Sequence, residues 1–307
     1  MGGYITLLRN NMNQLITKTT SRSTIGNITA NMYQPIKPEY YRLSREDFTD
    51  IVEDYSDLSI RWGCTSSIGT DIRYEVNKRE AIKLVCNKGR CRQFLYDQGI
   101  LVPEPVNLQI PTDNDFPMIV RPSFHQRGRN FLLFNNLHEY LLRHGEVRRL
   151  RRPYASRFFP KTKEYRVHVA HGKVLLVQEK LQTSPGPSAL NWNHENGYVF
   201  GVVRWKDYRN PIVRLAVDTI EAVGLNFGAV DILADPTDIS LLNAVVCEIN
   251  TAPKLEGYTA RRYAQYFDWL ITNKETKHFH IPEGTPARHY VFKNRELNDC
   301  EYDFGFI

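Results

Sequence analysis

The sequence predicts an α+β fold, in which hairpin-paired strands and amphipathic helices alternate along the chain. Two strand-like runs, 165–170 and 173–181, are separated only by His171-Gly172, which is a hairpin turn signal. Apolar residues recur at helical spacing within 78–98 and 211–223. Of the 307 residues, 42% are hydrophobic and 24% are charged, as in folded globular chains. Strands joined by hairpins exclude a simple doubly wound parallel sheet.

The N-terminal quarter, residues 1–75, is polar and interrupted. Within it, 4–8 is expected to form a first buried strand, and 58–62 a short strand that Gly63 ends. One helix is then predicted over 78–98, closed by Gly99 and followed by a turn and a loop.

The second half of the chain continues the mixed pattern. Strands are predicted over 117–122, 227–233 and 245–249, the last two as an antiparallel pair around the loop 234–243. Residues 183–201 are expected to be a long polar loop, and 258–270 a last helix; 275–307 is an unassigned tail.

Composition limits the class of partner and compartment. The net charge of +6 and the isoelectric point near 9.0 favour anionic partners. The 5 cysteines are scattered without a CxxC pair, which argues against disulfides and a zinc site and for a cytoplasmic protein. No apolar run is long enough for a membrane span, and no signal peptide opens the chain.

Arginines are concentrated in one short stretch. Two readings remain open, a solvated connection between elements and a patch for an anionic substrate, and the first is favoured. The residues are Arg143, Arg148, Arg149, Arg151 and Arg152.

Two carboxylates and an amide are expected on one face of the last strand pair. Glu248 and Asn250 point the same way because side chains alternate along a strand, and antiparallel pairing brings Asp231 opposite Glu248. Such oxygen donors suit Mg²⁺, although a short acidic pair alone is more often a surface feature.

The sequence around these residues resembles the metal-binding motif of ATP-grasp ligases, particularly the branch that adds glutamate to a ribosomal protein. The matching segments are 228–233, read GAVDIL, and 248–257, read EINTAPKLEG. The resemblance extends over roughly 55–270. It implies that Asp231, Glu248 and Asn250 hold two Mg²⁺ ions, replaceable by Mn²⁺, that bridge the phosphates of ATP.

The resemblance also implies nucleotide contacts further upstream. Lys88 and Arg121 take the places of two phosphate-binding lysines, and the loop with Arg127, Gly128 and Arg129 covers the phosphates. Arginine at 121 and a single glycine in the loop depart from the family pattern, and arginine is not a like-for-like replacement for lysine.

Further roles follow from the same resemblance. The segment 154–159, with Ser156, Arg157 and Phe158, is the hinge on which adenine lies, and Glu164 is a further nucleotide contact. The catalytic cations are Arg166 and Lys180, for which ordinary cross-strand pairing is an equal alternative. Asn191 and Asn193 in the long loop are expected to contact the transferred phosphate or the acceptor.

The implied architecture is two α+β lobes clasping ATP, preceded by a small α/β domain. The expected boundaries are 1–76 for the N-terminal domain, 77–155 for the nucleotide lobe and 156–274 for the catalytic lobe. The implied reaction joins a carboxylate to an amine of an amino acid, peptide or protein through an acyl-phosphate, with release of ADP and phosphate.

Three alternatives stay open at this stage. An ATP-grasp protein of kinase type would phosphorylate its substrate directly, and a degenerate member would only bind nucleotide. A nucleic-acid-binding module is compatible with the basic charge, but the sequence carries none of the usual recognition motifs.

Overall fold

The computed structural model describes the central part of the chain almost continuously and the two ends in pieces. Before Ile60 only backbone is described. The described residues are 3–9, 12–17, 39–43, 56–63, 65, 74–124, 131–183, 190, 192, 196–203, 210–235, 243–254, 259, 262–263, 266–267 and 270.

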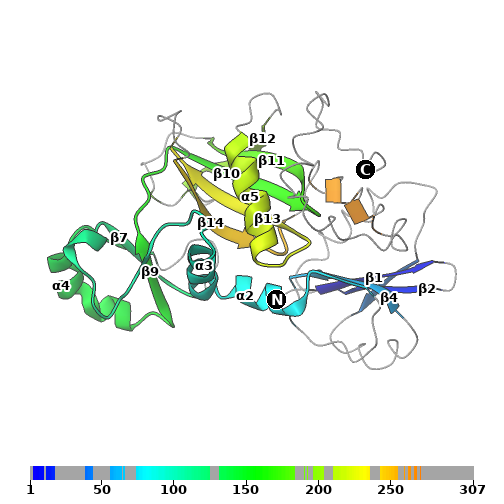
Figure 1. Ribbon diagram of the computed structural model, residues 1–307, viewed down its shortest axis with the longest axis horizontal. Helices are drawn as coiled ribbons and strands as arrows, with labels where there is room; N and C mark the ends of the chain where they lie inside the picture. The colour runs from blue at the N-terminus through cyan, green and yellow to red at the C-terminus, as the bar shows by residue number, and fades with distance from the viewer. Residues whose placement is uncertain are drawn as a thin grey trace.

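Three sheets follow one another along the chain (Figure 1). The first is mixed, with strand order β1-β3-β2-β4-β5. Its strands are β1 (Gly3–Arg9), β2 (Met12–Thr17), β3 (Glu39–Leu43), β4 (Ser56–Trp62) and β5 (Tyr74–Val76). Both expected N-terminal strands are present as β1 and β4, and β4 ends before Gly63, whose φ is 66°.

The single helix expected over 78–98 is wrong, because two helices occupy this segment. They are α2 (Arg79–Cys86) and α3 (Lys88–Asp97). Asn87 between them is extended, and its side-chain oxygen accepts a hydrogen bond from the backbone N–H of Arg90 at 3.2 Å. Asparagine is a strong N-cap residue, so Asn87 starts a new helix and places Lys88 in its first turn.

The second sheet, of order β6-β9-β7-β8, carries helix α4 beside it (Figure 1). Its elements are β6 (Pro105–Val106), β7 (Met118–Pro122), β8 (Leu132–Phe134), α4 (Leu137–Arg148) and β9 (Pro153–Arg157), with a 3₁₀ turn, η1 (Asp113–Asp115), between β6 and β7. Met118, Val120, Phe134 and Tyr140 form the centre of its core.

Helix α4 carries the first part of the arginine stretch, and the exposed Arg149, Arg151 and Arg152 lie in the connection from α4 to β9, as the favoured reading expected. Asn136 caps the helix by accepting from the N–H of Glu139 at 2.8 Å. Arg143 and Arg148 therefore lie on a helix, and Arg143 forms ion pairs with Glu139 at 2.6 Å and Glu146 at 2.8 Å.

The third sheet is antiparallel throughout, in the order β12-β11-β10-β13-β14. Its elements are β10 (Lys163–Ala170), β11 (Lys173–Gln182), β12 (Tyr198–Val202), β13 (Phe227–Ala234) and β14 (Ala244–Asn250). The expected hairpin is confirmed: His171 and Gly172 have φ of 45° and 74°, as a type I′ turn requires. The long loop was expected to reach 201, but 198–202 pair with β11 as strand β12.

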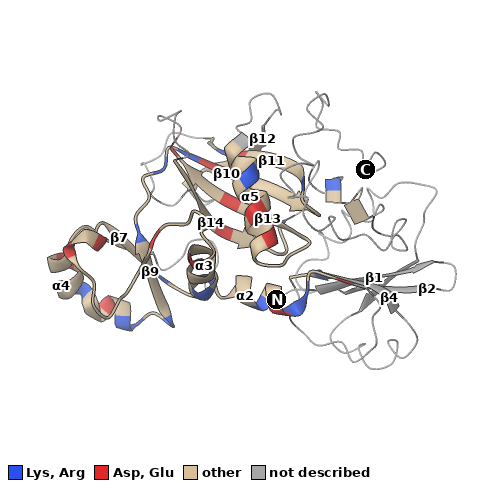
Figure 2. Cartoon of the chain, viewed as in Figure 1, with Lys and Arg blue, Asp and Glu red and all other residues tan. Residues whose placement is uncertain are grey.

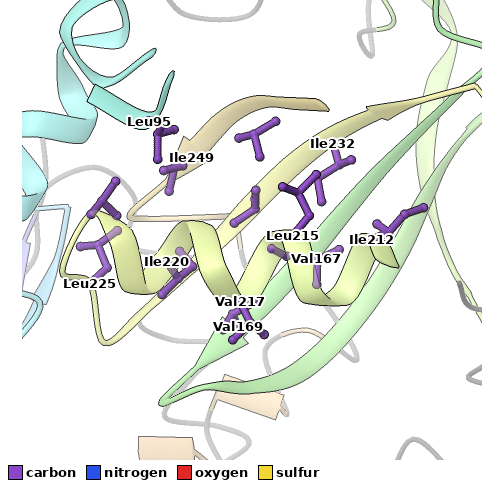
Figure 3. Packing of buried hydrophobic residues seen from close by; sticks show 14 of the residues in the cluster. Leu95, Val167, Val169, Ile212, Leu215, Val217, Ile220, Leu225, Ile232 and Ile249 are labelled. Carbon is purple, nitrogen blue, oxygen red and sulfur yellow. The ribbon is translucent and has the colours of Figure 1, made fainter. Parts of the chain in front are cut away.

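Helix α5 (Asn210–Ala222) covers one face of this third sheet (Figure 1). Figure 3 shows the contact: Leu215 and Ile220 of the helix lie over Val167 and Val169 of β10 and Ile232 of β13. Since side chains alternate along β10, the even-numbered residues of that strand point to the opposite face. The face away from α5 carries the polar residues described below.

An aromatic cluster joins the first sheet to the third. Trp62 stacks on Phe227 with ring centroids 5.4 Å apart and meets the edge of Tyr263 at 5.2 Å. The described residues of the expected last helix are helical, and Tyr263, Tyr266 and Phe267 among them are buried. Among the helices that the structure describes, none combines the length and apolar character needed to cross a membrane.

Candidate active site

The two carboxylates and the amide meet on adjacent strands. Asp231 of β13 stands directly opposite Glu248 of β14 in the antiparallel register. The side-chain nitrogen of Asn250 lies 3.3 Å from a carboxylate oxygen of Asp231 and 3.5 Å from one of Glu248. The expected convergence of these three side chains is therefore present, on the face of the sheet away from α5.

This donor set suits a hard divalent cation. Mg²⁺ is usually bound through one or two carboxylates, and it fills its remaining positions with water and phosphate oxygens. Within the described part of the chain, no group of three or more His, Cys, Asp or Glu side chains forms a metal cluster. A site here has two carboxylates and one amide oxygen and needs ligands from a substrate.

Each carboxylate is held by its own cation. Arg166 of β10 is opposite Asp231 in register and forms a two-pronged ion pair with it, at 2.6 Å from Nε and 2.7 Å from Nη2. Lys88, in the first turn of α3, forms an ion pair with Glu248. Helix α3 is thereby tied to the edge strand β14 at the site.

Burial and the neighbouring charges shift the pKa values of these side chains in opposite directions. Burial raises the pKa of Asp231, which is only 4% exposed, although the charge of Arg166 opposes the effect. Burial also acts to raise the pKa of Glu248, but Lys88, Arg166 and Arg121 outweigh it and hold that pKa well below its usual range. Burial acts to lower the pKa of Lys88, and Glu248 reverses the effect, so the lysine stays charged.

Arg121 lies at the end of β7, opposite Tyr154 of β9. Its guanidinium sits over the ring of Phe131 at 5.0 Å. Its Nε is buried and has no hydrogen-bond partner among the described residues. The loop residues Arg127, Gly128 and Arg129 lie outside the described residues.

The expected hinge forms strand β9 and the residues that follow it. The N–H of Arg157 donates to the carbonyl of Glu104 at 2.9 Å, and the N–H of Phe158 donates to that of Pro117 at 2.8 Å. The Arg157 side chain lies beside Glu104 at 3.3 Å, and Ser156 is buried. These two N–H groups are used within the sheet, so a base contact from this segment has to use its other groups.

Glu164, at the start of β10, already binds two cations. Lys161 donates to it at 2.5 Å, and Lys180 of β11 also forms an ion pair with it. The side chains of Lys180 and Arg166 both lie on the ring of Phe200 in β12, at 5.1 Å and 4.2 Å from its centroid. The two cations proposed from the sequence are thus neighbours on this face, brought together by an aromatic residue that the sequence did not single out.

Only fragments of the long loop are described. Asn191 and Asn193 lie outside the described residues. Trp192 between them stacks on Tyr198 with ring centroids 5.0 Å apart and carries Lys161 over its ring at 4.5 Å. This places Trp192 next to Lys161, which binds Glu164.

His168 lies on the same face of β10 as Arg166, two residues further along the strand. Its Nδ1 accepts from the hydroxyl of Tyr263 at 3.1 Å, and its Nε2 donates to the side-chain oxygen of Gln178 at 3.0 Å. Burial lowers the pKa of His168 to about 3, and the charge of Arg166 adds to the effect. His168 is therefore a neutral part of the packed core beside the site.

Sequence comparison gives no relative: no protein-family model matches the chain, and no curated protein matches it. Structure comparison does. D-alanine–D-alanine ligase from Bacillus anthracis matches at a TM-score of 0.59 and 15% identity, over 85% of this chain and 97% of that chain. The same enzyme complexed with ATP matches at a TM-score of 0.58 and 13% identity. At such low identity the likeness establishes the fold, and this chain has an α+β ATP-grasp fold.

Proposed function

We propose that the chain is an ATP-dependent carboxylate–amine ligase that works through an acyl-phosphate. The observation that carries the proposal is the paired arrangement of Asp231 with Arg166 and of Glu248 with Lys88, with Asn250 between the carboxylates. The ATP-grasp fold supports it, and so does the net charge of +6.

Charge pairing suggests how the site accepts its ligands. Two carboxylates that must release Lys88 and Arg166 are ready to hold Mg²⁺, while the released cations are ready to hold phosphate oxygens. When bound, Mg²⁺ supplies positive charge that neutralises the phosphate oxygens. Because both exchanges keep every charge paired, the metal and the nucleotide should bind together far better than either binds alone.

The remaining cations are suited to the transferred phosphate. Arg166 and Lys180 lie side by side on Phe200, and both present charge on the face that holds Asp231. In the proposed reaction a substrate carboxylate oxygen bonds to the γ-phosphorus and ADP leaves. The amine nitrogen then bonds to the acyl carbon and loses a proton, and inorganic phosphate leaves. Arg166 and Lys180 would stabilise the negative charge on the phosphoryl oxygens in both steps.

No nucleophilic side chain is required by this scheme. Cys91 and Cys247 have pKa values raised by burial, so neither is a ready thiolate. The protein's work is to hold and orient two substrates and to exclude water from the acyl-phosphate. We further propose the lobe boundaries given above, with the nucleotide between the sheet β6-β9-β7-β8 and the sheet that contains β13 and β14.

The test is a screen for phosphate and ADP release with Mg²⁺ and ATP. Candidate carboxylates are amino acids and acidic peptides, candidate acceptors are amines and peptides, and mass spectrometry identifies the product. The ligase is supported if ADP release requires both the carboxylate and the amine, and if the mass of the product equals the sum of the two substrate masses minus one water. A product that carries the phosphate and forms without any amine would replace it with a phosphotransferase.

A further inference from the structure

Arg92 is a buried cation that the site described so far does not use. It lies one helical turn after Lys88 on α3, and residues four apart share a helix face. The helix approaches the second sheet closely there: a Cβ on Gly89 would come within 2.9 Å of Ser123 Oγ and 3.0 Å of Tyr154 Cβ. The Arg92 side chain is consequently held between α3, β9 and β14, and the residue is only 8% exposed.

The hydrogen bonds of Arg92 are incomplete. Nη2 donates to the backbone carbonyl of Cys247 at 2.8 Å, and the guanidinium lies 5.7 Å from the ring centroid of Tyr154. Nε and Nη1 are buried and have no hydrogen-bond partner among the described residues. Buried charged donors without acceptors are costly, so an arginine in this state indicates a ligand that supplies them.

A second arginine points to the same place. Arg121 stands opposite Tyr154 in the β7–β9 register, so the two arginines flank one tyrosine. The Nε of Arg121 is also buried without a partner among the described residues. The charges of both arginines also oppose the rise that burial causes in the pKa of Cys247, the β14 residue whose carbonyl accepts a hydrogen bond from Arg92.

We propose that Arg92 contributes a further contact to the α-phosphate of the nucleotide, beside Arg121, which the family resemblance already places at the phosphates. The proposal rests on the proposed function, in which Asp231, Glu248 and Asn250 lie at the β- and γ-phosphates. Cys247 is one residue before Glu248 on β14, a step of about 3.3 Å along the strand. The next phosphate along the nucleotide therefore falls beside the two arginines, whose planar N–H groups match phosphate oxygens.

A purely structural role for Arg92 makes different predictions. If Arg92 served only to fix the carbonyl of Cys247, its loss would lower thermal stability and weaken the binding of every ligand of the site alike. If it binds the α-phosphate, its loss weakens ligands that contain this phosphate and spares those that lack it.

The experiment compares the variant Arg92→Ala with the control variant Arg90→Ala. Arg90 is an exposed arginine on the same helix. Affinities for ADP, AMP and adenosine are measured by competition against a fluorescent ADP analogue, with Mg²⁺ present. Arg92→Ala should weaken ADP and AMP by roughly tenfold to a hundredfold, the effect of losing a charged hydrogen bond, and leave adenosine unchanged. Arg90→Ala should leave all three unchanged, and guanidinium ion added to Arg92→Ala should restore part of the ADP affinity.

The outcomes separate the two proposals. A wild-type protein that binds no ADP overturns the proposed function and this inference with it. A wild type that binds ADP, with Arg92→Ala binding it equally well, overturns the α-phosphate assignment alone. An equal loss for adenosine also overturns it, by placing Arg92 at the base or in a structural role. If Arg92→Ala fails to fold, Arg92→Lys replaces it and should show the same selective loss, smaller in size.

Discussion

Replacing Lys88 with alanine should change the affinities for metal and nucleotide in opposite directions. In the structure Lys88 is paired with Glu248, and the side chains are 21% and 24% exposed. Removing the lysine frees Glu248 for a divalent cation and removes a cation from the phosphate site. An ordinary structural lysine would not produce this pair of opposite effects.

The magnitudes follow from the two contacts. A charge-assisted hydrogen bond to phosphate is worth about 1.5–3 kcal/mol, so metal-free ADP should bind roughly tenfold to 150-fold more weakly. At 4 Å two unit charges interact by about 4 kcal/mol at an effective dielectric constant near 20, before desolvation is subtracted. With partial solvent screening we expect about 1–2 kcal/mol, so the metal alone should bind roughly 5- to 30-fold more tightly.

The assay uses Mn²⁺ as the probe, because free Mn²⁺ is quantified directly by electron paramagnetic resonance. ADP affinity is measured separately without metal by calorimetry, and Lys83→Ala on the exposed face of α2 is the matched control. Weaker or unchanged Mn²⁺ binding in Lys88→Ala would refute the exchange of partners. Unchanged ADP affinity would remove Lys88 from the phosphate site.

Three further outcomes are expected. Glu248→Ala should abolish Mg²⁺-dependent ATP turnover while the circular dichroism spectrum stays native, and activity at the wild-type level would remove Glu248 from the metal site. Arg121→Lys should retain more ATP affinity than Arg121→Ala in a calorimetric titration, and equal loss in both would show that the fork matters more than the charge. For His168, whose folded-state pKa is lowered to about 3, the unfolded chain takes up the proton first, so its contribution to stability is lost as the pH falls from about 6.5 toward 3. Between these pH values, His168→Gln should reduce the slope of the urea-derived free energy of unfolding against pH by up to about 1.4 kcal/mol per pH unit. A variant curve parallel to that of the wild type would contradict the lowered pKa of His168.

The convergence of Asp231, Glu248 and Asn250 on one face was predictable because it depends on local rules. Strand alternation places Glu248 and Asn250 on one face, and a short antiparallel connection brings Asp231 opposite Glu248. Lys88 and Arg166 were expected from the sequence as phosphate-site cations, but their ion pairs with Glu248 and Asp231 were not predicted. That Lys88 reaches Glu248 across the sequence depends on how α3 packs against β14, which no local pattern specifies.

The errors in secondary structure have identifiable signals. The helix over 78–98 is broken by Asn87, and α4 begins after Asn136 with Glu139 in its first turn. Both are asparagine N-caps, and the second carries the acidic residue that favours a helix start. Apolar periodicity alone could not separate α2 from α3, because their buried residues lie at compatible spacings.

Arg92 was missed for a different reason. Its helical position relative to Lys88 was available from the sequence, since the two are four residues apart. Its burial was not, because an arginine on a helix is normally solvated, and only the packing of α3 against Tyr154 and Cys247 covers it.

Cations outnumber carboxylates around the proposed site, and this imbalance explains why the site should bind a polyanion. Asp231, Glu248 and Glu164 are the carboxylates that hold its paired cations. Against them stand Lys88, Lys161, Arg166 and Lys180, while Arg92 and Arg121 form no ion pair with a carboxylate of the described residues, although the charge of Arg121 acts on Glu248. A folded protein does not gain stability from buried cations that lack partners, so such groups indicate a bound anion. The exposed arginines of 148–152 differ because solvent screens their charges. They lie at the end of α4 and before β9, and not on the third sheet, which carries Asp231 and Glu248 (Figure 2). Anion recognition at this site should therefore depend on its wholly and partly buried cations, and it should persist at salt concentrations that remove any attraction by the surface stretch.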